Sequence, residues 1–369
     1  MESKSTIIAF YLPQYYPIKE NDEWFGKGFT EWTSVGNSKP LYKGHYQPRV
    51  PADLGYYDLR IPEVRKAQAD LAKEAGISAF CYYHYWFGKG KQMLEMPINE
   101  VVRLGEPDFP FCLAWANHTW YRKTWDVQRS VLDKIPLLKQ EYLGKDDMKA
   151  HFETLLPVFK DARYLKVKDK LLFVLYRVED IPDLTEFMSY WQCLAKENGL
   201  PGFYFVSYAD DKTRLKNVAH NQCDASILSL KTELDSFTSN VHIRKGYRLF
   251  HALFYQLMHR PNVYSYKELI KKLVDPIFHE DRIYPVLYPN WDNTPRRGCG
   301  SLIIEGSTPK MFKQQAKEVL SLIKDKHISD QIVFVKSWNE WGEGNYMEPD
   351  LKYGKGYIEA LREALSEME

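Results

Sequence analysis

Short β-type runs alternate with segments of helical periodicity along this sequence. Eight such runs stand at 6–11, 77–83, 109–115, 171–176, 202–208, 224–228, 283–288 and 331–338. The helical patterns lie between or after them, at 61–76, 148–159, 183–198, 264–274, 309–326 and 355–367. Strands that alternate with helices are typical of a parallel sheet, and eight of them predict an α/β fold closed into a (β/α)8 TIM barrel. An open doubly wound sheet is the alternative, but no phosphate-binding G-x-G-x-x-G turn follows the first run.

The length of 369 residues is compatible with one large barrel or with two average domains. No low-complexity segment and no linker rich in Pro, Gly and Ser divides the chain, so we expect one catalytic domain over residues 1–369. A closed barrel predicts that 6–11 and 331–338 are neighbouring parallel strands. Residues 12–61 lack clear periodicity, and their aromatic content argues against disorder. We expect them to form a long loop over the barrel mouth, at the C-terminal face, with His45 as a structural hydrogen bonder.

Charge and hydropathy exclude several classes of protein. The formal net charge is +1 with both signs interspersed, which gives no electrostatic footprint for nucleic acid or for an anionic membrane. No apolar stretch approaches the length of a transmembrane segment, and the N-terminal apolar run is too short for a signal sequence. The five cysteines are odd in number and widely spaced, as in a protein with reduced thiols. We expect a cytoplasmic protein.

Two glutamates follow the last β-type run, within "SWNEWGEG" at 337–344. Glu340 and Glu343 would face opposite sides of a straight strand, but in a turn they converge. Gly342 and Gly344 make such a turn plausible, with both carboxylates directed into the barrel mouth. Two converging carboxylates can divide the acid and base roles of glycosidic bond chemistry, whereas the alternative is that one is an exposed loop acid. We predict that Glu340 and Glu343 are catalytic.

Tryptophan is concentrated at the predicted strand ends. Nine of the ten tryptophans follow predicted strands, and Trp191 alone lies in a predicted helix. The strand ends of a (β/α)8 barrel open on one face, where active sites are found. Flat apolar rings with polar edges suit a sugar-binding cleft, although any single tryptophan can simply fill space at the mouth. The nine are Trp24, Trp32, Trp86, Trp115, Trp120, Trp125, Trp291, Trp338 and Trp341.

Polar candidates share these strand ends. His84 in "YYHYWF" and Asn117 and His118 in "AWANHTW" suit recognition of sugar hydroxyls, although either histidine can instead be a satisfied core residue. The segment "YPNWDNTPRRG" adds Arg296 and Arg297, which are either solvated or hold a phosphate or carboxylate of the ligand. The predicted substrate-binding residues are Tyr11, Glu31, Trp32, His84, Tyr85, Trp86, Trp115, Asn117, His118, Trp291, Asp292, Asn293, Arg296, Trp338, Asn339 and Trp341.

Several metal and nucleotide motifs are missing from the sequence. It contains no H-E-x-x-H, no Cys/His cluster with zinc spacing and no G-x-x-x-x-G-K-[ST]. No two aspartates are separated by a single residue, so the Asp-x-Asp metal clamp of many nucleotide-sugar transferases is missing. We therefore expect a metal-independent site that uses no cofactor.

Six motifs in order resemble one known family over nearly the whole chain. They are "AFYLPQYYPIKENDEWFGKGFTEW", "GHYQPRVPADLGYYDLR", "GISAFCYYHYWF", "FPFCLAWANHTW", "WDNTPRR" and "SWNEWGEGNYMEPD". Together they look like the WbsX-like proteins, which are named as glycosyltransferases of bacterial O-antigen and capsule loci and are related to glycoside hydrolase family 99. The resemblance implies a (β/α)8 barrel.

The resemblance also implies roles for the two glutamates, because family 99 endo-α-mannosidases carry an N-E-W-x-E-G turn after the last strand. There the first acid, here Glu340, acts as a base on the sugar 2-hydroxyl to form a 1,2-anhydro intermediate. The second, here Glu343, is the general acid/base at the glycosidic oxygen.

Three functions are compatible with these observations. The first is cleavage or transfer of an α-linked, mannose-type glycoside in surface-polysaccharide metabolism, on an oligosaccharide or glycan that can be lipid-linked. The second is a sugar-nucleotide-dependent transferase acting on a lipid-linked acceptor, with Arg296 and Arg297 at phosphate. The third is a non-catalytic glycan-binding barrel. The missing Asp-x-Asp weighs against the second, and the presence of both Glu340 and Glu343 weighs against the third.

Overall fold

Eight parallel strands close into a barrel in the computed structural model, which describes residues 5–122, 135–229, 246, 249–250 and 261–368. The strands are β1 Thr6–Tyr11, β2 Ala79–Trp86, β4 Phe111–Trp115, β8 Lys170–Leu175, β9 Phe203–Ala209, β10 Ala225–Leu228, β12 Ile283–Leu287 and β15 Ile332–Val335. β1 pairs in parallel with β15 on one side and with β2 on the other, which closes the ring. The barrel and its closure between the first and last strands confirm the fold predicted from the sequence. The last strand is shorter than predicted, because the chain leaves the sheet after Val335.

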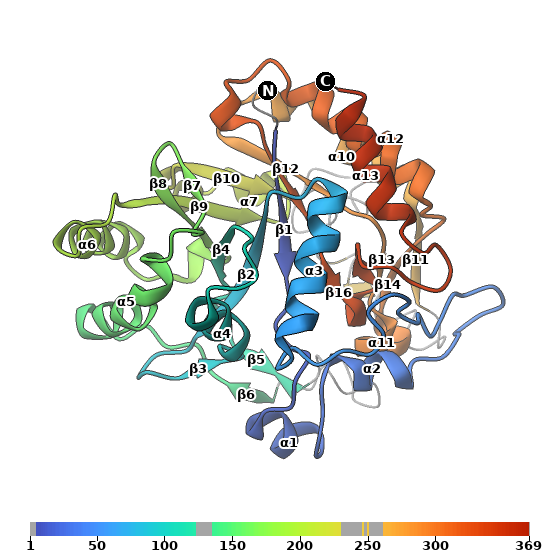
Figure 1. Ribbon diagram of the computed structural model, residues 1–369, viewed down its shortest axis with the longest axis horizontal. Helices are drawn as coiled ribbons and strands as arrows, with labels where there is room; N and C mark the ends of the chain where they lie inside the picture. The colour runs from blue at the N-terminus through green and yellow to red at the C-terminus, as the bar shows by residue number, and fades with distance from the viewer. Residues whose placement is uncertain (1–4, 123–134, 230–245, 247–248, 251–260, 369) are drawn as a thin grey trace.

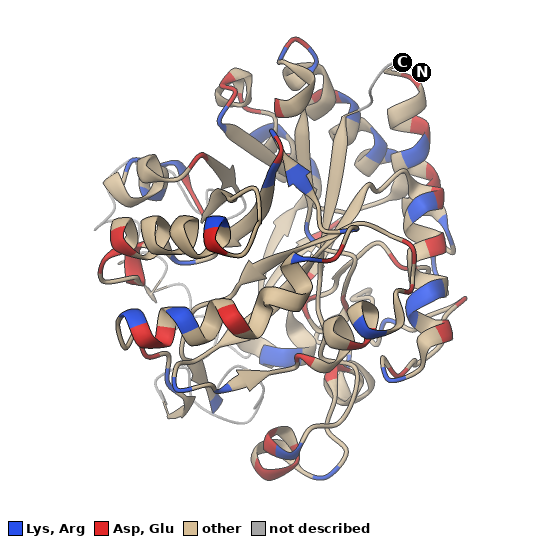
Figure 2. Ribbon diagram, turned by 60° about the vertical axis from the view of Figure 1, so that its left-hand side comes forward, with Lys and Arg blue, Asp and Glu red and all other residues tan. Residues whose placement is uncertain are grey.

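An outer layer of helices covers the barrel (Figure 1). α13 packs against both α12 and α3, and so joins the last and first units of the layer. In Figure 2 the charged residues lie mostly on these helices and on loops, whereas the barrel strands are mostly uncharged. The helices are α1 Lys19–Phe25, α2 Glu31–Asn37, α3 Pro62–Ala75, α4 Met96–Leu104, α5 Lys145–Phe159, α6 Leu184–Glu197, α7 Lys212–Leu215, α8 Val218–Gln222, α10 Tyr266–Leu273, α11 Thr294–Arg297, α12 Pro309–Ile323 and α13 Gly356–Ser366.

The helix α3 shows how the sequence sets its limits. Pro62 begins it, at a position where the missing N–H leaves no hydrogen bond unmade. Gly76 ends it in the left-handed conformation, with φ of 83°, and its N–H donates to the carbonyls of Ala72 and Lys73. α4 was not recognised in the sequence, because nine residues give too few turns to establish a helical period.

Alternation along the barrel strands decides which side chains reach the interior. Phe10 points inward, with its ring centre 5.4 Å from those of both Tyr83 and Phe334. Its neighbour Tyr11 points outward and donates a hydrogen bond to Gln68 of α3. Because side chains alternate along a strand, every second residue of each barrel strand points out of the barrel rather than into its interior.

Smaller elements gather at the C-terminal ends of the barrel strands. In Figure 1, β1 points down toward α1, α2, α11, β5 and β6, whereas both chain ends lie at the opposite end of the molecule. Two short sheets belong to this end, one formed by β11, β14 and β13 and the other by β5 and β6, together with the hairpin of β16 and β17 that follows β15. The short strands of the molecule are β3 Gln92–Met93, β5 Trp120–Tyr121, β6 Pro136–Leu138, β7 Lys166–Val167, β11 Asn262–Ser265, β13 Trp291–Asp292, β14 Leu302–Glu305, β16 Asn339–Glu340 and β17 Asn345–Tyr346.

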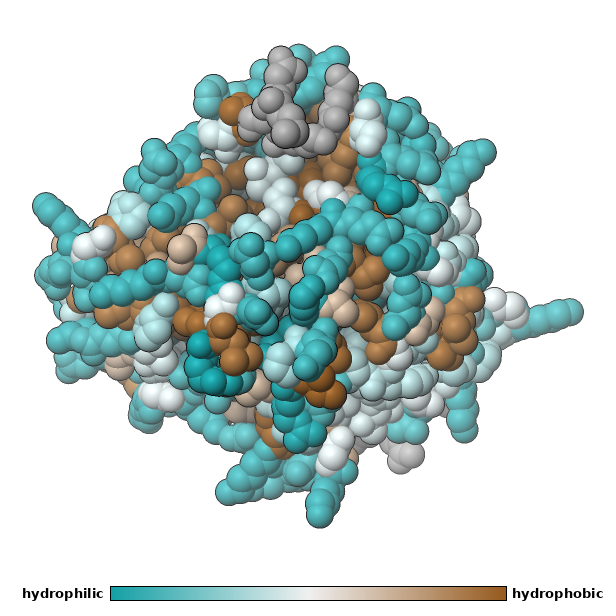
Figure 3. Space-filling model, viewed as in Figure 1, coloured by the Kyte–Doolittle hydropathy of each residue, from teal (hydrophilic) through white to brown (hydrophobic). Residues whose placement is uncertain are grey.

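The outer surface in this view is mixed in hydropathy. Figure 3 shows hydrophobic residues in separate groups among hydrophilic ones. Among the residues that the structure describes, no helix has both the length and the apolar character needed to cross a bilayer.

The side chain of Asn339 extends the pairing between the first and last barrel units. Its Oδ1 accepts a hydrogen bond from the Leu12 N–H at 2.7 Å, and its Nδ2 donates to the Leu12 carbonyl at 3.0 Å. Asn339 is fully buried. The amide therefore satisfies two backbone groups just beyond β1, where no strand is available to pair with them.

We expect Asn339→Ala to lower the free energy of unfolding by about 2–4 kcal/mol, because the buried N–H and C=O of Leu12 would both lose their partners. Urea denaturation followed by circular dichroism measures the change. Gln314→Ala is the control, since Gln314 is exposed and its side chain bonds that of Glu318 on the surface of α12. Equal stability of the two variants would contradict this role for Asn339.

Candidate active site

A cavity of about 640 Å³ opens at the C-terminal ends of the barrel strands. We call it the mouth cavity. Side chains from the ends of most barrel strands line it, so segments far apart in the sequence face one another across it. The lining residues are Leu12, Gln14, Tyr83, Tyr85, Ala116, His118, Thr119, Trp120, Tyr121, Tyr176, Arg177, Asp180, Tyr208, Asp210, Trp291, Asn293, Arg296, Arg297, Lys336, Glu340 and Glu343.

Both predicted catalytic glutamates line this cavity. Glu340 lies at the end of β16, and Glu343 lies in the short 3-10 turn that follows, Trp341–Glu343. Gly344 ends the turn in the left-handed conformation, with φ of 53°. A β-carbon at Gly344 would lie 2.6 Å from the Asp292 carbonyl oxygen. The turn therefore brings the two carboxyl groups to the same wall, and only glycine fits at its end.

Gly342 is required for a different reason. A β-carbon there would lie 1.8 Å from Oε1 of Glu31, a separation that no side chain could accept. The Gly342 N–H donates to the same Glu31 carboxylate. Glu31 is fully buried at the start of α2, behind the turn rather than in the cavity. The Gly342 backbone thus packs directly on the buried Glu31 carboxylate, which supports the turn Trp341–Glu343, here called the glutamate turn.

Arg296 joins this buried acid to the cavity. Its Nε lies 2.7 Å from Glu31 Oε1, and its Nη1 lies 3.0 Å from Glu343 Oε1. Burial disfavours the charged guanidinium, but the two carboxylates outweigh it and raise the pKa of Arg296 well above its ordinary value. One permanent cation thus lies between two acids, and it fixes the position of Glu343.

Glu340 has a different environment from Glu343. Its side chain is buried, whereas that of Glu343 is 23% exposed. Burial, and after it the nearby Glu343 carboxylate, raises the pKa of Glu340 to about 8. Its Oε2 has no hydrogen-bond partner among the described residues. Glu340 therefore holds a proton at neutral pH in the ligand-free site.

Lys336 lies in the interior of the barrel below the two glutamates. Its Nζ donates to the Tyr176 hydroxyl at 3.0 Å and lies 5.3 Å from the centre of the Tyr208 ring. Burial acts to lower the pKa of Lys336, but the phenols of Tyr176 and Tyr208 raise it above its ordinary value on balance. The side chain is a buried cation that faces the mouth cavity.

Seven of the residues predicted from the sequence line the mouth cavity: Tyr85, His118, Trp291, Asn293, Arg296, Glu340 and Glu343. Burial, followed by the neighbouring charges of Arg177 and Lys336, lowers the pKa of His118 to about 4, so its imidazole is neutral at pH 7.

Four predicted residues point out of the barrel instead, because they occupy the outward positions of their strands. Tyr11 contacts α3, as described above. His84 contacts His151 of α5 at 2.8 Å between the two Nε2 atoms, and burial lowers the pKa of His84 to about 3. Trp86 donates to Asp147, and Trp115 donates to the Trp86 carbonyl. Their position corrects the prediction that they contact substrate.

Six further predicted residues form contacts around the mouth or in the core without lining the cavity. Asn117 bonds the N–H and the carbonyl of Arg177, which ties the ends of β4 and β8 together. Asn339 bonds Leu12, and Glu31 bonds Arg296, as already described. The others are rings that pack in the core or in the loops. Trp32 donates to the Tyr57 carbonyl, Trp338 packs on Phe80, and Trp341 stacks on Tyr346 and donates to Glu348.

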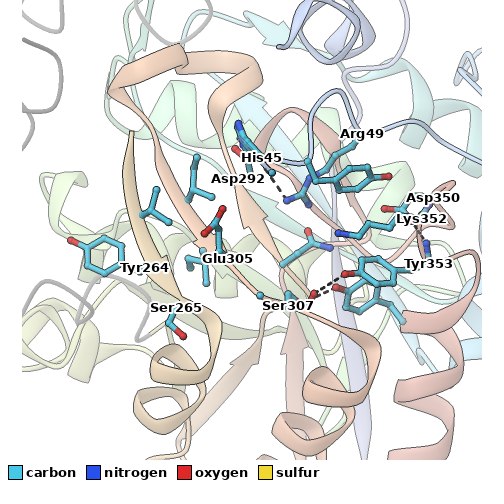
Figure 4. A pocket seen from close by; sticks show the side chains of 18 residues that line it. His45, Arg49, Tyr264, Ser265, Asp292, Glu305, Ser307, Asp350, Lys352 and Tyr353 are labelled. Carbon is cyan, nitrogen blue, oxygen red and sulfur yellow. Dashed lines mark hydrogen bonds and ion pairs between the residues drawn. The ribbon is translucent and has the colours of Figure 1, made fainter. Parts of the chain in front are cut away.

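Asp292 belongs to a second cavity, of about 430 Å³, on the other face of β13 (Figure 4). Adjacent residues of β13 face opposite ways, so Trp291 lines the mouth cavity while Asp292 lines the second one. Its Oδ2 lies 2.8 Å from Nε2 of His45 and 2.7 Å from Nε2 of Gln47. The structural hydrogen-bonding role predicted for His45 is confirmed, and Asp292 is its partner.

The prediction of a rim of nine tryptophans is wrong in its extent. Of the tryptophans in the described part of the chain, Trp120 and Trp291 line the mouth cavity. Trp24 packs edge-on against Trp120 from outside. Trp125 lies outside the described residues. Aromatic character in the mouth comes instead from tyrosines.

Sequence reasoning missed the inner wall of the cavity, formed by Tyr83, Tyr176, Arg177, Tyr208 and Lys336. Except for Arg177, these residues occupy inward positions of their strands or extend that alternation by one residue. Tyr83 and Tyr85 are two residues apart in β2 and therefore point to the same side of the strand. Counting in steps of two predicts that His84 and Trp86 point to the other side.

In the described ranges, no three His, Cys, Asp or Glu side chains are grouped as metal ligands would be.

Comparison with curated proteins gives two relatives, both named "Uncharacterized protein WxcX". They come from Xanthomonas campestris pv. campestris, strains B100 and ATCC 33913. Each is 34% identical over 363 residues, which make up 98% of this chain and 50% of the relative. The chain thus spans about half the length of the curated relatives it matches.

Solved structures share the barrel. The GH99 endo-alpha-mannosidase from Bacteroides thetaiotaomicron superposes with a TM-score of 0.54 at 14% identity, over 98% of this chain and 96% of that one. A protein described as a glycoside hydrolase-like protein gives a TM-score of 0.59 at 12% identity, over 99% and 94% of the two chains. At these identities the likeness concerns the fold.

The sequence model of the family described as "Glycosyltransferase WbsX" matches residues 7–361. The chain therefore belongs to the WbsX glycosyltransferase family of carbohydrate-active proteins, built on a barrel like that of the GH99 glycoside hydrolases.

Proposed function

We propose that this protein is an enzyme that cleaves or transfers an α-linked, mannose-type glycoside in bacterial surface-polysaccharide metabolism, through Glu340 and Glu343. The observation that carries the proposal is the pair itself. Both carboxyl groups line one cavity at the mouth of the barrel, yet one is buried and protonated while the other is compensated by Arg296. Different environments for two neighbouring acids are what a division into acid and base requires.

The proton content of the pair fits this chemistry. Glu340 keeps its proton up to about pH 8, while Arg296 compensates the charge of Glu343. At neutral pH the pair then carries one proton, which moves between two neighbouring carboxyl groups. In the ligand-free site that proton lies on Glu340, so substrate binding must transfer it to Glu343 before Glu340 can act as the base.

We assign the roles by the resemblance to family 99. Glu340 takes the proton of the sugar 2-hydroxyl, whose oxygen then attacks the anomeric carbon. Glu343 gives a proton to the glycosidic oxygen as that bond breaks. Water or a sugar hydroxyl then opens the 1,2-anhydro ring, and the two glutamates exchange roles. The exposed side of Glu343 suits contact with a leaving group that enters and departs.

A sugar-nucleotide-dependent transferase would need residues other than Arg296 to bind the phosphates of its donor. Arg296 is held by Glu31 and Glu343, so it is not placed to bind a phosphate as the sequence suggested. Arg297 is exposed at the edge of the cavity. The family name supports a transferase, and a transferase built on this site would use the same two glutamates.

We expect Glu340→Gln and Glu343→Gln each to lower the rate by about 10²–10⁴-fold, the usual scale for general acid–base catalysis. An aryl α-mannoside or an α-mannosyl fluoride should restore much of the rate to Glu343→Gln, because its leaving group needs little protonation. Glu340→Gln should gain nothing, because its partner is the sugar. Equal rescue of both variants, or full activity in either folded variant, would contradict the assignment.

The pH dependence of kcat/KM should be bell-shaped, with the alkaline limb near pH 8. As pH rises through the raised pKa of Glu340, the pair loses its last proton and with it the acid. As pH falls, the pair gains a second proton and loses the base. In Glu343→Gln the like charge is removed, so the alkaline limb should move to lower pH. A profile that is flat between pH 7 and 9 would contradict the shared proton.

Trp291→Ala should weaken glycan binding by about 1–3 kcal/mol, since its ring lines the mouth cavity and can stack on a pyranose. Calorimetry with a mannose-configured oligosaccharide measures the change. Tyr56→Ala is the matched control, because that aromatic ring is 54% exposed and does not line the cavity. Unchanged affinity in folded Trp291→Ala would show that the sugar binds elsewhere.

A further inference from the structure

The inner wall of the mouth cavity carries positive charge that the proposed chemistry does not use. Lys336, at the end of β15, and Arg177, just after β8, both line the cavity, and His118 lies beside them. The rings of His118 and Tyr176 are 6.1 Å apart, and the Tyr176 hydroxyl accepts the hydrogen bond from Lys336. We call Lys336 and Arg177, together with the neutral His118 beside them, the cationic wall.

Polar atoms of the cationic wall lack partners within the protein. Among the described residues, neither Lys336 nor Arg177 forms an ion pair with a carboxylate. Arg177 Nε and His118 Nδ1 are buried with no hydrogen-bond partner in that part of the chain. The contacts of Lys336 are a phenol oxygen and the faces of the Tyr176 and Tyr208 rings, at 5.4 and 5.3 Å from their centres.

Neighbouring acids do not neutralise this wall. Glu343 is bonded to Arg296. Glu340 interacts with Lys336 through space, but burial and the Glu343 carboxylate raise the pKa of Glu340 to about 8, so it is protonated at neutral pH in the ligand-free site. Asp210 lines the same side of the cavity, but its Oδ2 is bonded to Arg214 at 2.6 Å. Asp180 is the remaining carboxylate on the lining. Keeping an ammonium group away from water is costly unless a counter-charge approaches it.

We propose that the cationic wall binds an anionic group, a carboxylate or a phosphate, carried by the sugar that occupies the mouth cavity. This inference rests on the proposed function, because it places the sugar between the wall and the Glu340–Glu343 pair. A neutral sugar offers only hydroxyls to Lys336 and Arg177, and hydroxyls do not compensate a buried charge. A hexuronate, a sugar phosphate or a nucleotide sugar does so, and each would accept from the unpartnered donors.

Equilibrium binding tests the proposal without relying on turnover. Calorimetry compares one neutral and two anionic ligands of the same sugar configuration: methyl α-D-mannopyranoside, its C6 uronic acid and α-D-mannose 1-phosphate. The same three ligands in gluco configuration and inorganic phosphate complete the set. We expect at least one anionic sugar to bind about tenfold or more tightly than its neutral counterpart, as for a ligand that gains a charged hydrogen bond.

The variants identify the residue responsible. Lys336→Met keeps most of the length of the side chain without its charge and should remove most of the preference for the anion, while leaving the affinity for the neutral glycoside within about twofold. Arg177→Met is the second variant, should Lys336→Met fail to fold by circular dichroism. Lys352→Met is the matched control, since Lys352 is an exposed lysine of the second cavity, and it should bind like wild type.

Each outcome decides between sources of the charge. A preference for the uronic acid assigns a carboxylate-bearing glycoside, and a preference for the 1-phosphate assigns an activated donor. Equal binding of charged and neutral sugars, no binding by any anionic probe up to about 10 mM, or a preference that persists in both Met variants would overturn the proposal. The result is separable from the proposed function, since Glu340→Gln and Glu343→Gln should retain the preference while losing activity.

Discussion

Three distant segments of the chain meet at one buried guanidinium. Arg296, in α11, lies between Glu31 of α2 and Glu343 of the glutamate turn. Removing Arg296 would leave the buried Glu31 carboxylate without a counter-charge, which is far more destabilising than losing a surface ion pair. The position of α2, the shape of the glutamate turn and the orientation of Glu343 therefore depend on the same contact. Gly342 permits it, because any β-carbon there would collide with Glu31.

This arrangement gives the two sides of the mouth cavity different charges. On one side Arg296 compensates the acids, so that a single proton remains on the Glu340–Glu343 pair near neutral pH. On the other side Lys336 and Arg177 carry charge that the described residues do not balance. A sugar held between the two sides would meet acid–base groups at one edge and cations at another. The ligand-free cavity thus has a polarity that a substrate of matching charge would complete.

The local patterns in the sequence were sufficient for the barrel and for the glutamate turn. Eight β-type runs with intervening helices left few topologies open, and the strands lie within a few residues of their predicted limits. The two glycines around Glu343 indicated a turn, and the turn is present. The positions of the tryptophans in the sequence also predicted aromatic residues at the strand ends. They did not reveal which rings face the cavity: Trp86 and Trp115 were predicted to contact substrate, but they occupy outward positions.

Sequence by itself determined what depends on nearest neighbours along the chain: the strand–helix alternation, the glycine turn and the presence of two acids three residues apart. Tertiary structure alone decided the partners. It paired Arg296 with Glu31 rather than leaving it for a ligand, turned Asp292 away toward His45, and brought Lys336 under the tyrosines of three other strands. These contacts join residues that lie tens to hundreds of positions apart. Their charges interact through space and through burial, which local sequence patterns do not encode.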